Sequence, residues 1–322
     1  MTSDANYDND GSMSSDPSGP APRLARGVYT ANLVAQMGIV VTGAVVRLTS
    51  SGLGCPTWPR CTADSYVPVA GQTETWHKYV EFGNRSLTFV LVILAIAALA
   101  VGYLDLRRRS REGRAARPQL MAFAAVPFIG TFAQALLGGV TVLTGLSPLV
   151  VAAHLLVSLG IIALMTNLVK RANEPDDIPI TWTVRYEIRI GAWLLTGLMA
   201  VVLTLGTLVT ASGPHAGDER VARLGFDPQE ISSAHADLVL LSIGLMIGLI
   251  VALRATDGAS KAIHAAMLAF IVYVSQGFIG FVQYFTGLPW LVVALHVLGS
   301  TVVWWATVRF LLSTRARGMV SD

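Results

Sequence analysis

Residues 134–154 have the sequence QALLGGVTVLTGLSPLVVAAH, and residues 276–296 have a second version of it, QGFIGFVQYFTGLPWLVVALH. The two stretches align without a gap at a single offset of 142 residues, and both begin with glutamine and end with histidine. They also share a Thr-Gly-Leu triplet and a Leu-Val-Val-Ala run. A match of this length indicates an internal duplication. We therefore expect two similar halves, built around His154 and His296.

The composition places the chain in a membrane. Of its 322 residues 53% are hydrophobic and only 13% are charged, which is more apolar surface than a soluble core can hide. A bilayer core of roughly 30 Å needs about 20 apolar residues per helix, and helices satisfy their own backbone hydrogen bonds in lipid. The stretches that qualify are approximately 27–48, 80–104, 119–143, 148–170, 189–211, 233–254, 261–285 and 289–312.

The predicted fold class is therefore all-α: a polytopic membrane protein with eight transmembrane helices. Because four spans return the chain to its starting side, the duplication predicts a parallel repeat of two pseudo-symmetric four-helix bundles lying side by side. The predicted divisions are a disordered cytoplasmic tail at 1–22, a first bundle at 23–171, a cytoplasmic linker at 172–188 and a second bundle at 189–322. The tail lacks the apolar core of a signal peptide, so we expect the first span to direct insertion.

The distribution of Lys and Arg predicts the orientation, because cytoplasmic loops carry an excess of basic residues. Most of the 23 basic residues fall in one set of segments, including a solvated basic loop predicted at 105–118. These segments and both termini are expected in the cytoplasm. The net charge of +3 then reflects membrane topology, and no nucleic-acid partner is expected.

The only two cysteines, Cys55 and Cys61, fall in the first extracytoplasmic connection. A disulfide persists in such a compartment, and the prolines between the cysteines favour a bent chain that could bring them together. We favour a disulfide here. Two unconnected thiols or a metal-binding pair are the alternatives that the sequence leaves open.

Three histidines, His154, His235 and His296, are predicted near the outer ends of their helices, at one depth in the membrane. An ionisable residue inside the membrane is costly and marks a functional site. His235 and His296 belong to the same half and fit axial ligation of haem iron inside a helical bundle. The alternative is a pair of neutral histidines hydrogen-bonded between helices.

The first half differs from the second at this level, because Asn84 aligns with His235. Glu81, Asn84 and Arg85 share one helix face by their spacing. Glu81 is a candidate for stabilising positive charge or relaying a proton in a pocket that His154 faces. The alternative is a simple ion pair of Glu81 with Arg85 at the helix end. One bundle is thus predicted to hold a cofactor, and the other to form a reaction site.

The stretch from Arg47 to Cys61, RLTSSGLGCPTWPRC, resembles the first extracytoplasmic loop of haem A synthases. The Glu-x-x-x-Arg of the second span and the duplicated histidine are similar to that family too. The resemblance implies a membrane oxidoreductase of the bacterial cell membrane, which oxidises the C8 methyl of haem O to the formyl group of haem A. The oxygen comes from water, and the product serves aa3-type cytochrome oxidase.

The resemblance also implies the roles of the residues. His235 and His296 would hold a haem b cofactor, Glu81 would be important for activity, and His154 would ligate the iron of the substrate haem O, with Asn84 and Arg85 nearby. The family has a histidine at the position of Asn84. Because asparagine is a poor iron ligand, we expect His154 to hold that iron alone, or together with water or a weak neutral group. The loop cysteines of the family correspond to Cys55 and Cys61.

The expected partners, besides membrane lipid, are the protohaem farnesyltransferase that makes haem O and oxidase assembly factors, and a homo-oligomer is compatible with the sequence. The alternative function is a non-enzymatic electron-transfer cytochrome with two haems, which would share the histidines but would not need the asymmetric Glu81 and Asn84. A transporter built from parallel repeats is a third class and predicts no haem.

Overall fold

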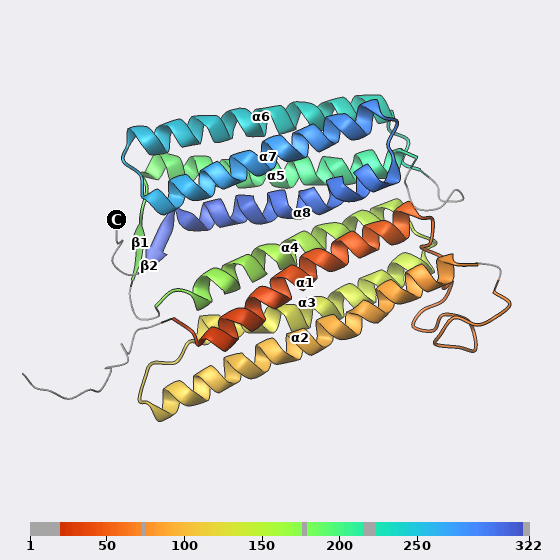
Figure 1. Ribbon diagram of the computed structural model, residues 1–322, viewed down its shortest axis with the longest axis horizontal. Coiled ribbons are helices and arrows are strands. Elements are labelled where there is room, and N and C mark those ends of the chain that lie inside the picture. Colours follow the sequence, from red (N-terminus) through yellow and green to blue (C-terminus); the bar gives the residue numbers. More distant parts are fainter. Residues whose placement is uncertain (1–19, 73–74, 176–178, 215–222, 318–322) are drawn as a thin grey trace, which may run out of the picture.

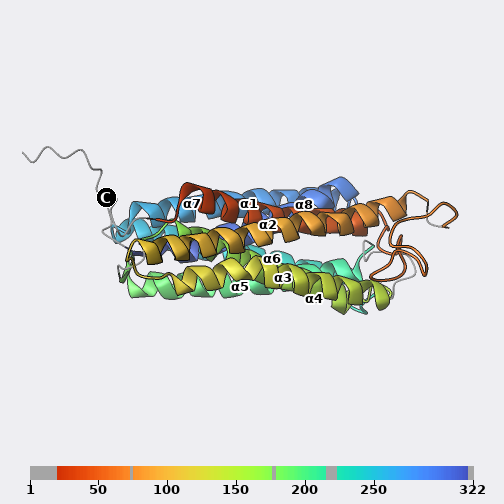
Figure 2. The ribbon, with the colours of Figure 1, turned by 90° about the horizontal axis from the view of Figure 1, so that it is seen from below.

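The computed structural model describes residues 20–72, 75–175, 179–214 and 223–317. In these residues there are eight long helices and two short strands: α1 (Arg23–Leu48), α2 (His77–Arg111), α3 (Pro118–Leu143), α4 (Pro148–Ala172), β1 (Ile180–Trp182), α5 (Tyr186–Ser212), α6 (Pro228–Ala255), α7 (Ser260–Phe285), α8 (Trp290–Ser313) and β2 (Arg315–Arg317). All eight helices are long and apolar enough to cross a membrane, and they run side by side along one direction (Figures 1 and 2).

The helices pack as two groups of four. In the first group α1 contacts α2 and α4, and α3 contacts α2 and α4; in the second, α5 contacts α6 and α8, and α7 contacts α6 and α8. The groups meet where α8 packs against α1 and α4, and where α4 packs against α5. The predicted architecture of eight apolar helices in two side-by-side groups is confirmed (Figure 1). The internal duplication and the domain boundaries remain predictions.

The Thr-Gly-Leu triplet of the opening sequence is a helix stop. After α3, Gly145 and Leu146 have φ of 60° and 63°, and after α7, Gly287 and Leu288 have φ of 75° and 60°. The leucine N–H donates back over the end of the helix in both places, from Leu146 to the Thr141 carbonyl and from Leu288 to the Gln283 carbonyl, each at 2.8 Å. Glycine reaches this left-handed conformation without a steric cost, which explains its place in the triplet.

Three local details differ from the sequence predictions. Helix α2 continues to Arg111, so part of the predicted basic loop at 105–118 is helical. Asp105 and Arg109 explain this extension, because they form an ion pair at the i, i+4 spacing and such pairs stabilise a helix. The linker contains β1, which pairs antiparallel with β2 near the C-terminus, a two-stranded addition to the all-α fold. Ala21, in the predicted tail, is buried and donates to the Ala172 carbonyl. Residues 1–19 of that tail lie outside the described residues.

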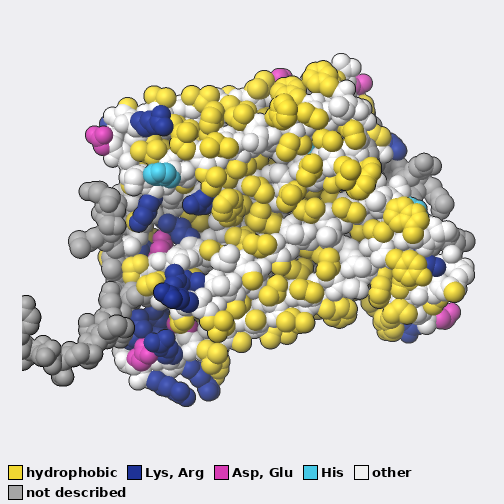
Figure 3. Space-filling model, viewed as in Figure 1, with side chains coloured by type: hydrophobic (Ala, Val, Ile, Leu, Met, Phe, Trp, Pro, Cys, Tyr) yellow, Lys and Arg dark blue, Asp and Glu magenta, His cyan; other side chains and the backbone are white. Residues whose placement is uncertain are grey.

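The surface has two kinds of region. Many large apolar side chains are exposed along the helices, among them Phe89 and Phe285 at 73% and 77% exposure, and Figure 3 shows apolar atoms covering the sides of the molecule. In this view most Lys and Arg side chains gather at one end, where Figure 1 places the end of α2 and the strands. An apolar belt with a basic end is the surface expected of a membrane-spanning bundle.

Candidate functional site

The three histidines lie near the starts of their helices, on α4, α6 and α8, and all are half-buried. Each ring packs against a glycine of the neighbouring helix. The pairs are His154 with Gly138 of α3, His235 with Gly206 of α5, and His296 with Gly280 of α7. A methyl group at these glycines would lie 3.4, 3.3 and 3.2 Å from the ring carbon Cε1. A larger side chain would therefore press on the ring, so these glycines form cradles for the imidazoles.

The hydrogen bonds of the rings decide which nitrogen is free. His235 Nδ1 lies 3.0 Å from the Val202 carbonyl oxygen. Because a carbonyl only accepts, Nδ1 must carry the proton, and Nε2 keeps its lone pair for a ligand. In His154 and His296, Nδ1 is buried and has no hydrogen-bond partner among the described residues.

Two glutamines hold the histidine helices in place. Gln134 Nε2 donates to the His154 carbonyl at 2.9 Å, and Gln276 Nε2 donates to the His296 carbonyl at 2.8 Å. These bonds join α3 to α4 and α7 to α8 at the level of the rings. Interhelical bonds from amide side chains stabilise such packing in a membrane. Sequence reasoning missed this role, although both glutamines open the repeated stretch.

Glu81 and Arg85 form a clamp on the loop that joins α1 to α2. Glu81 is only 4% exposed, and its Oε1 accepts from Arg85 Nη2 at 2.5 Å and from Nε at 3.0 Å. Its Oε2 accepts from the Cys55 backbone N–H at 2.7 Å. Arg85 also donates to three loop carbonyls, those of Cys55, Thr57 and Arg60, at 2.7, 2.9 and 3.3 Å. The pair is therefore more than the helix-end ion pair considered as an alternative, because it fixes the loop above the first bundle.

The clamped loop carries the disulfide. Cys55 and Cys61 are bonded, as the sequence favoured, and both are buried. Between them, Trp58 reaches down onto α3: a methyl group at Gly139 would lie 2.5 Å from its ring. Gly139 is the neighbour of Gly138, against which His154 packs. The loop thus reaches the level of the first-half histidine.

Asn84 is held by a different contact. Thr42 Oγ1 of α1 donates to Asn84 Oδ1 at 2.7 Å. Within the described chain there is no hydrogen bond or ion pair between His154 and Glu81, Asn84 or Arg85. The first half therefore presents one imidazole, and its Glu81 is engaged with the loop.

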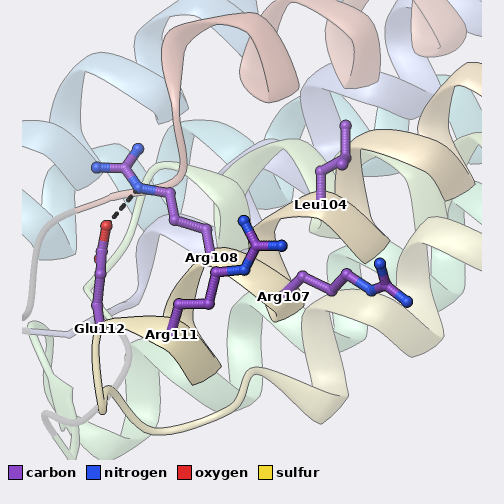
Figure 4. A pocket seen from close by; sticks show the side chains of 5 residues that line it. All are labelled: Leu104, Arg107, Arg108, Arg111 and Glu112. Atoms are coloured by element: carbon purple, nitrogen blue, oxygen red, sulfur yellow. Dashed lines mark hydrogen bonds and ion pairs between the residues drawn. The ribbon is translucent and has the colours of Figure 1, made fainter.

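A pocket of about 430 Å³ lies far from the histidines, at the basic end of α2. It is lined by Leu104, Arg107, Arg108, Arg111 and Glu112, and Figure 4 shows Arg108 turned toward Glu112 while Arg107 and Arg111 extend away from that carboxylate. Arg108 Nε donates to Glu112 at 2.7 Å. This bond, with a second from Arg114, holds the pKa of the Glu112 carboxyl below its usual value. The pocket is separate from the candidate site.

The side chains of the site suit haem iron and not a bare metal ion. Among the described residues, no three His, Cys, Asp or Glu side chains lie together as a bare-metal site. Haem iron needs only axial ligands, because the porphyrin supplies the other four. Cradled imidazoles with free ring nitrogens fit that requirement.

The fold and these contacts define a class of protein: a polytopic helical membrane protein with glycine-packed imidazoles in both of its bundles and a disulfide loop clamped over one of them. The family model of the cytochrome oxidase assembly proteins matches residues 27–217, and the chain belongs to that family.

Curated relatives are similar over parts of the chain. A protein of Geobacillus kaustophilus named "Heme A synthase" is 31% identical over 116 residues, which is 36% of this chain and 32% of the relative. The protein of that name from Lysinibacillus sphaericus is 32% identical over 138 residues, 42% of this chain and 41% of the relative. The one from Staphylococcus epidermidis is 24% identical over 286 residues, 84% of this chain and 89% of the relative. The match thus spans about a third of the Geobacillus protein's length.

Proposed function

We propose that this protein is a haem A synthase, a membrane oxidoreductase that oxidises the C8 methyl of haem O to the formyl group of haem A for aa3-type cytochrome oxidase. Family membership and the name shared by its relatives support the proposal. The observation that carries it is the set of imidazoles, each seated against a glycine, with the His235 tautomer fixed so that Nε2 is free to bind iron.

The second half is the proposed site of a haem b cofactor, with His235 and His296 as axial ligands. The Val202 carbonyl orients the His235 ring through its Nδ1–H, and such outer partners set ring orientation and ligand strength. Gln276 fixes the backbone of His296. Bound there, haem b would supply one-electron redox chemistry.

The first half is the proposed site of the substrate. His154 holds the substrate iron, and Asn84, already bonded to Thr42, leaves the opposite face to water or a weak neutral group. Glu81 brings a negative charge beneath the loop, where it would stabilise positive charge that develops as the methyl group is oxidised. Arg85 and the disulfide loop position that carboxylate and keep bulk water from the site. Water would supply the oxygen of the formyl group, and an external electron acceptor would take the four electrons that leave the methyl carbon together with four protons.

Pigment analysis tests the proposal. Protein purified from cells that make haem O is extracted, and its haems are identified by chromatography and mass. We expect haem b together with haem O or haem A. Haem b as the only pigment in both halves would support the electron-transfer cytochrome instead, and a colourless protein would refute haem binding altogether.

A histidine substitution tests the cofactor assignment separately. We expect His296→Ala to lose the low-spin haem b spectrum. The exposed His264, whose Nδ1 contacts only the Ser260 carbonyl of its own helix, gives the control variant His264→Ala, which should keep it. A His296→Ala protein with the full spectrum would overturn the assignment.

The location of the protein is part of the proposal. We place it in the plasma membrane of a bacterium, with the basic end of Figure 3 and both termini in the cytoplasm. Contact with the farnesyltransferase that makes haem O and with oxidase assembly factors would allow transfer of an apolar haem. Reporter tags at both ends of the chain should be active only on the cytoplasmic side; an outward-facing tag would contradict this orientation.

A further inference from the structure

Arg47, at the outer end of α1, has two guanidinium nitrogens that lack a hydrogen-bond partner among the described residues. Its Nε and Nη2 are buried and make no hydrogen bond in the part of the chain that the structure describes. The other arginine of the outer half of this bundle, Arg85, donates to a carboxylate and three carbonyls. A guanidinium inside a membrane protein is costly unless an anion or acceptors satisfy it. The unpaired donors of Arg47 therefore indicate an anionic ligand.

Arg47 lies on the face of α1 that borders the proposed substrate site in the first half. It lies one turn outward from Gly43, on the same helix face. The residues Gly43-Ala-Val-Val-Arg47 of α1 are similar to Gly206-Thr-Leu-Val-Thr210 of α5, so Gly43 corresponds to Gly206. Gly206 packs against the His235 ring, whereas a methyl group at Gly43 would meet nothing within 4 Å. This face of α1 therefore borders open space where the second half has an imidazole. Thr42, the neighbour of Gly43, bonds Asn84, which places the space at the level of Asn84.

The second half has no charge at the position equivalent to Arg47. The residue that aligns with Arg47 is Thr210, whose hydroxyl donates to the Gly206 carbonyl of its own helix at 2.8 Å. The unpaired cation is thus a feature of the first half, where the proposed function puts the substrate.

We propose that Arg47 binds a carboxylate of the porphyrin held in the first half, that is, a propionate of the substrate haem. This inference rests on the proposed function. A guanidinium matches a carboxylate with two parallel N–H donors, and a porphyrin is a flat apolar ring whose carboxylates lie on one edge. Because Arg47 lies one turn nearer the outer surface than Gly43, the carboxylate edge faces that surface and the apolar edge points into the membrane.

The test compares two probes on the full-length protein in detergent. The probes are ferric protoporphyrin IX and its dimethyl ester, in which both carboxylates are capped, and the readout is affinity from Soret titration. We expect the wild type to bind the free acid about tenfold to a hundredfold more tightly than the ester, as a charge-assisted hydrogen bond implies. Arg47→Gln should bind the free acid as weakly as the ester, with the ester affinity unchanged. Arg47→Lys should recover part of the difference.

Controls separate the outcomes. Arg60 is an exposed arginine of the same loop region whose side chain donates to the Ala63 carbonyl, and Arg60→Gln should keep the wild-type preference for the free acid. Equal affinity of the wild type for both probes, or an equal loss of both in Arg47→Gln, would overturn the role of Arg47. The ester comparison needs no variant, so it holds even if Arg47→Gln folds poorly.

One further variant distinguishes the two proposals. If His154→Ala binds the free acid as tightly as the wild type, the first-half haem site is wrong, and the proposed function fails with it. If His154→Ala loses binding while Arg47→Gln does not, only the role of Arg47 fails. A tenfold excess of an anionic phospholipid that abolishes the preference for the free acid would assign Arg47 to a lipid phosphate and refute the porphyrin carboxylate.

Discussion

Replacing Arg85 by leucine should release the loop between α1 and α2 from the first bundle. Arg85 joins the loop to α2 in two ways: it pairs with Glu81, and it donates to the carbonyls of Cys55, Thr57 and Arg60. Leucine preserves the helix and most of the side-chain volume but removes every donor. Glu81 is then left as a buried carboxylate whose only remaining partners are backbone N–H groups of the loop, including that of Cys55.

The structure sets the size of the effect. Removing one partner of a buried ion pair costs about 3 to 5 kcal/mol. The Arg85 side chain is 21% exposed and that of Glu81 only 5%, so water relieves part of the cost and the lower end applies. A loss of about 3 kcal/mol shifts the equilibrium for local opening of the loop by roughly a hundredfold. The helices themselves should stay folded, because loops open locally at a lower free energy than the core.

Hydrogen exchange measures that opening directly. The Cys55 amide donates to Glu81 at 2.7 Å, so its protection reports whether the loop is closed. We expect Arg85→Leu to lower this protection roughly a hundredfold. Arg108→Leu is the matched control: Arg108 pairs with Glu112 at the same spacing at the end of α2, but with side chains 57% and 38% exposed, where water screens the pair and its loss should leave the loop protection unchanged.

Unchanged protection of the Cys55 amide in Arg85→Leu would refute the clamp. An intermediate variant separates the two roles of Glu81. Glu81→Gln keeps a carbonyl oxygen that accepts from Cys55 but removes the charge. If Glu81 only holds the loop, haem A formation should fall in proportion to the protection lost in Glu81→Gln and Arg85→Leu. If its charge acts on the reaction, Glu81→Gln should lose much more activity than its loop protection accounts for.

Three other predictions concern stability and the haem. Gly139→Ala should lower the unfolding free energy by about 1 to 3 kcal/mol by overpacking, because the new methyl would lie 2.5 Å from the Trp58 ring. Gly160→Ala is the control, because a methyl there would meet nothing within 4 Å; equal melting temperatures of the two variants would contradict the prediction. Gln276→Leu removes the 2.8 Å hydrogen bond to the His296 carbonyl, so it should lower the unfolding free energy by about 0.5 to 1.5 kcal/mol. It should also shift the midpoint potential of the second-half haem in a redox titration; an unchanged potential would count against a positioning role for Gln276. Reducing the loop disulfide should cost about 2 kcal/mol, visible as a lower melting temperature in reductant; an unaltered melting curve would show that the cross-link does not stabilise the fold.

Much of the site was visible in the sequence as residue types at a spacing. The histidines, the cysteines and the Glu-x-x-x-Arg motif were all identified, because each is rare in an apolar chain. Their partners were not. The glycine cradles and Arg47 were passed over because glycine is common in membrane helices and an arginine near a helix end is expected there. Gly138 and Gly280 carried one signal that could have found them: they repeat at the same offset as the histidines.

The sequence by itself determined the local features: the eight apolar spans and the position of both cysteines in one short loop. Only the tertiary structure decided which faces meet. Trp304 Nε1 of α8 donates to the Leu159 carbonyl of α4, which is 145 residues away in the sequence, and the Trp58 ring packs against Gly139. The reason is physical: in a membrane the lipid-facing and buried sides of a helix are both apolar, so hydrophobic periodicity, which marks the core face of a soluble helix, carries little information. Which faces pack then depends on small residues and single hydrogen bonds between distant parts of the chain.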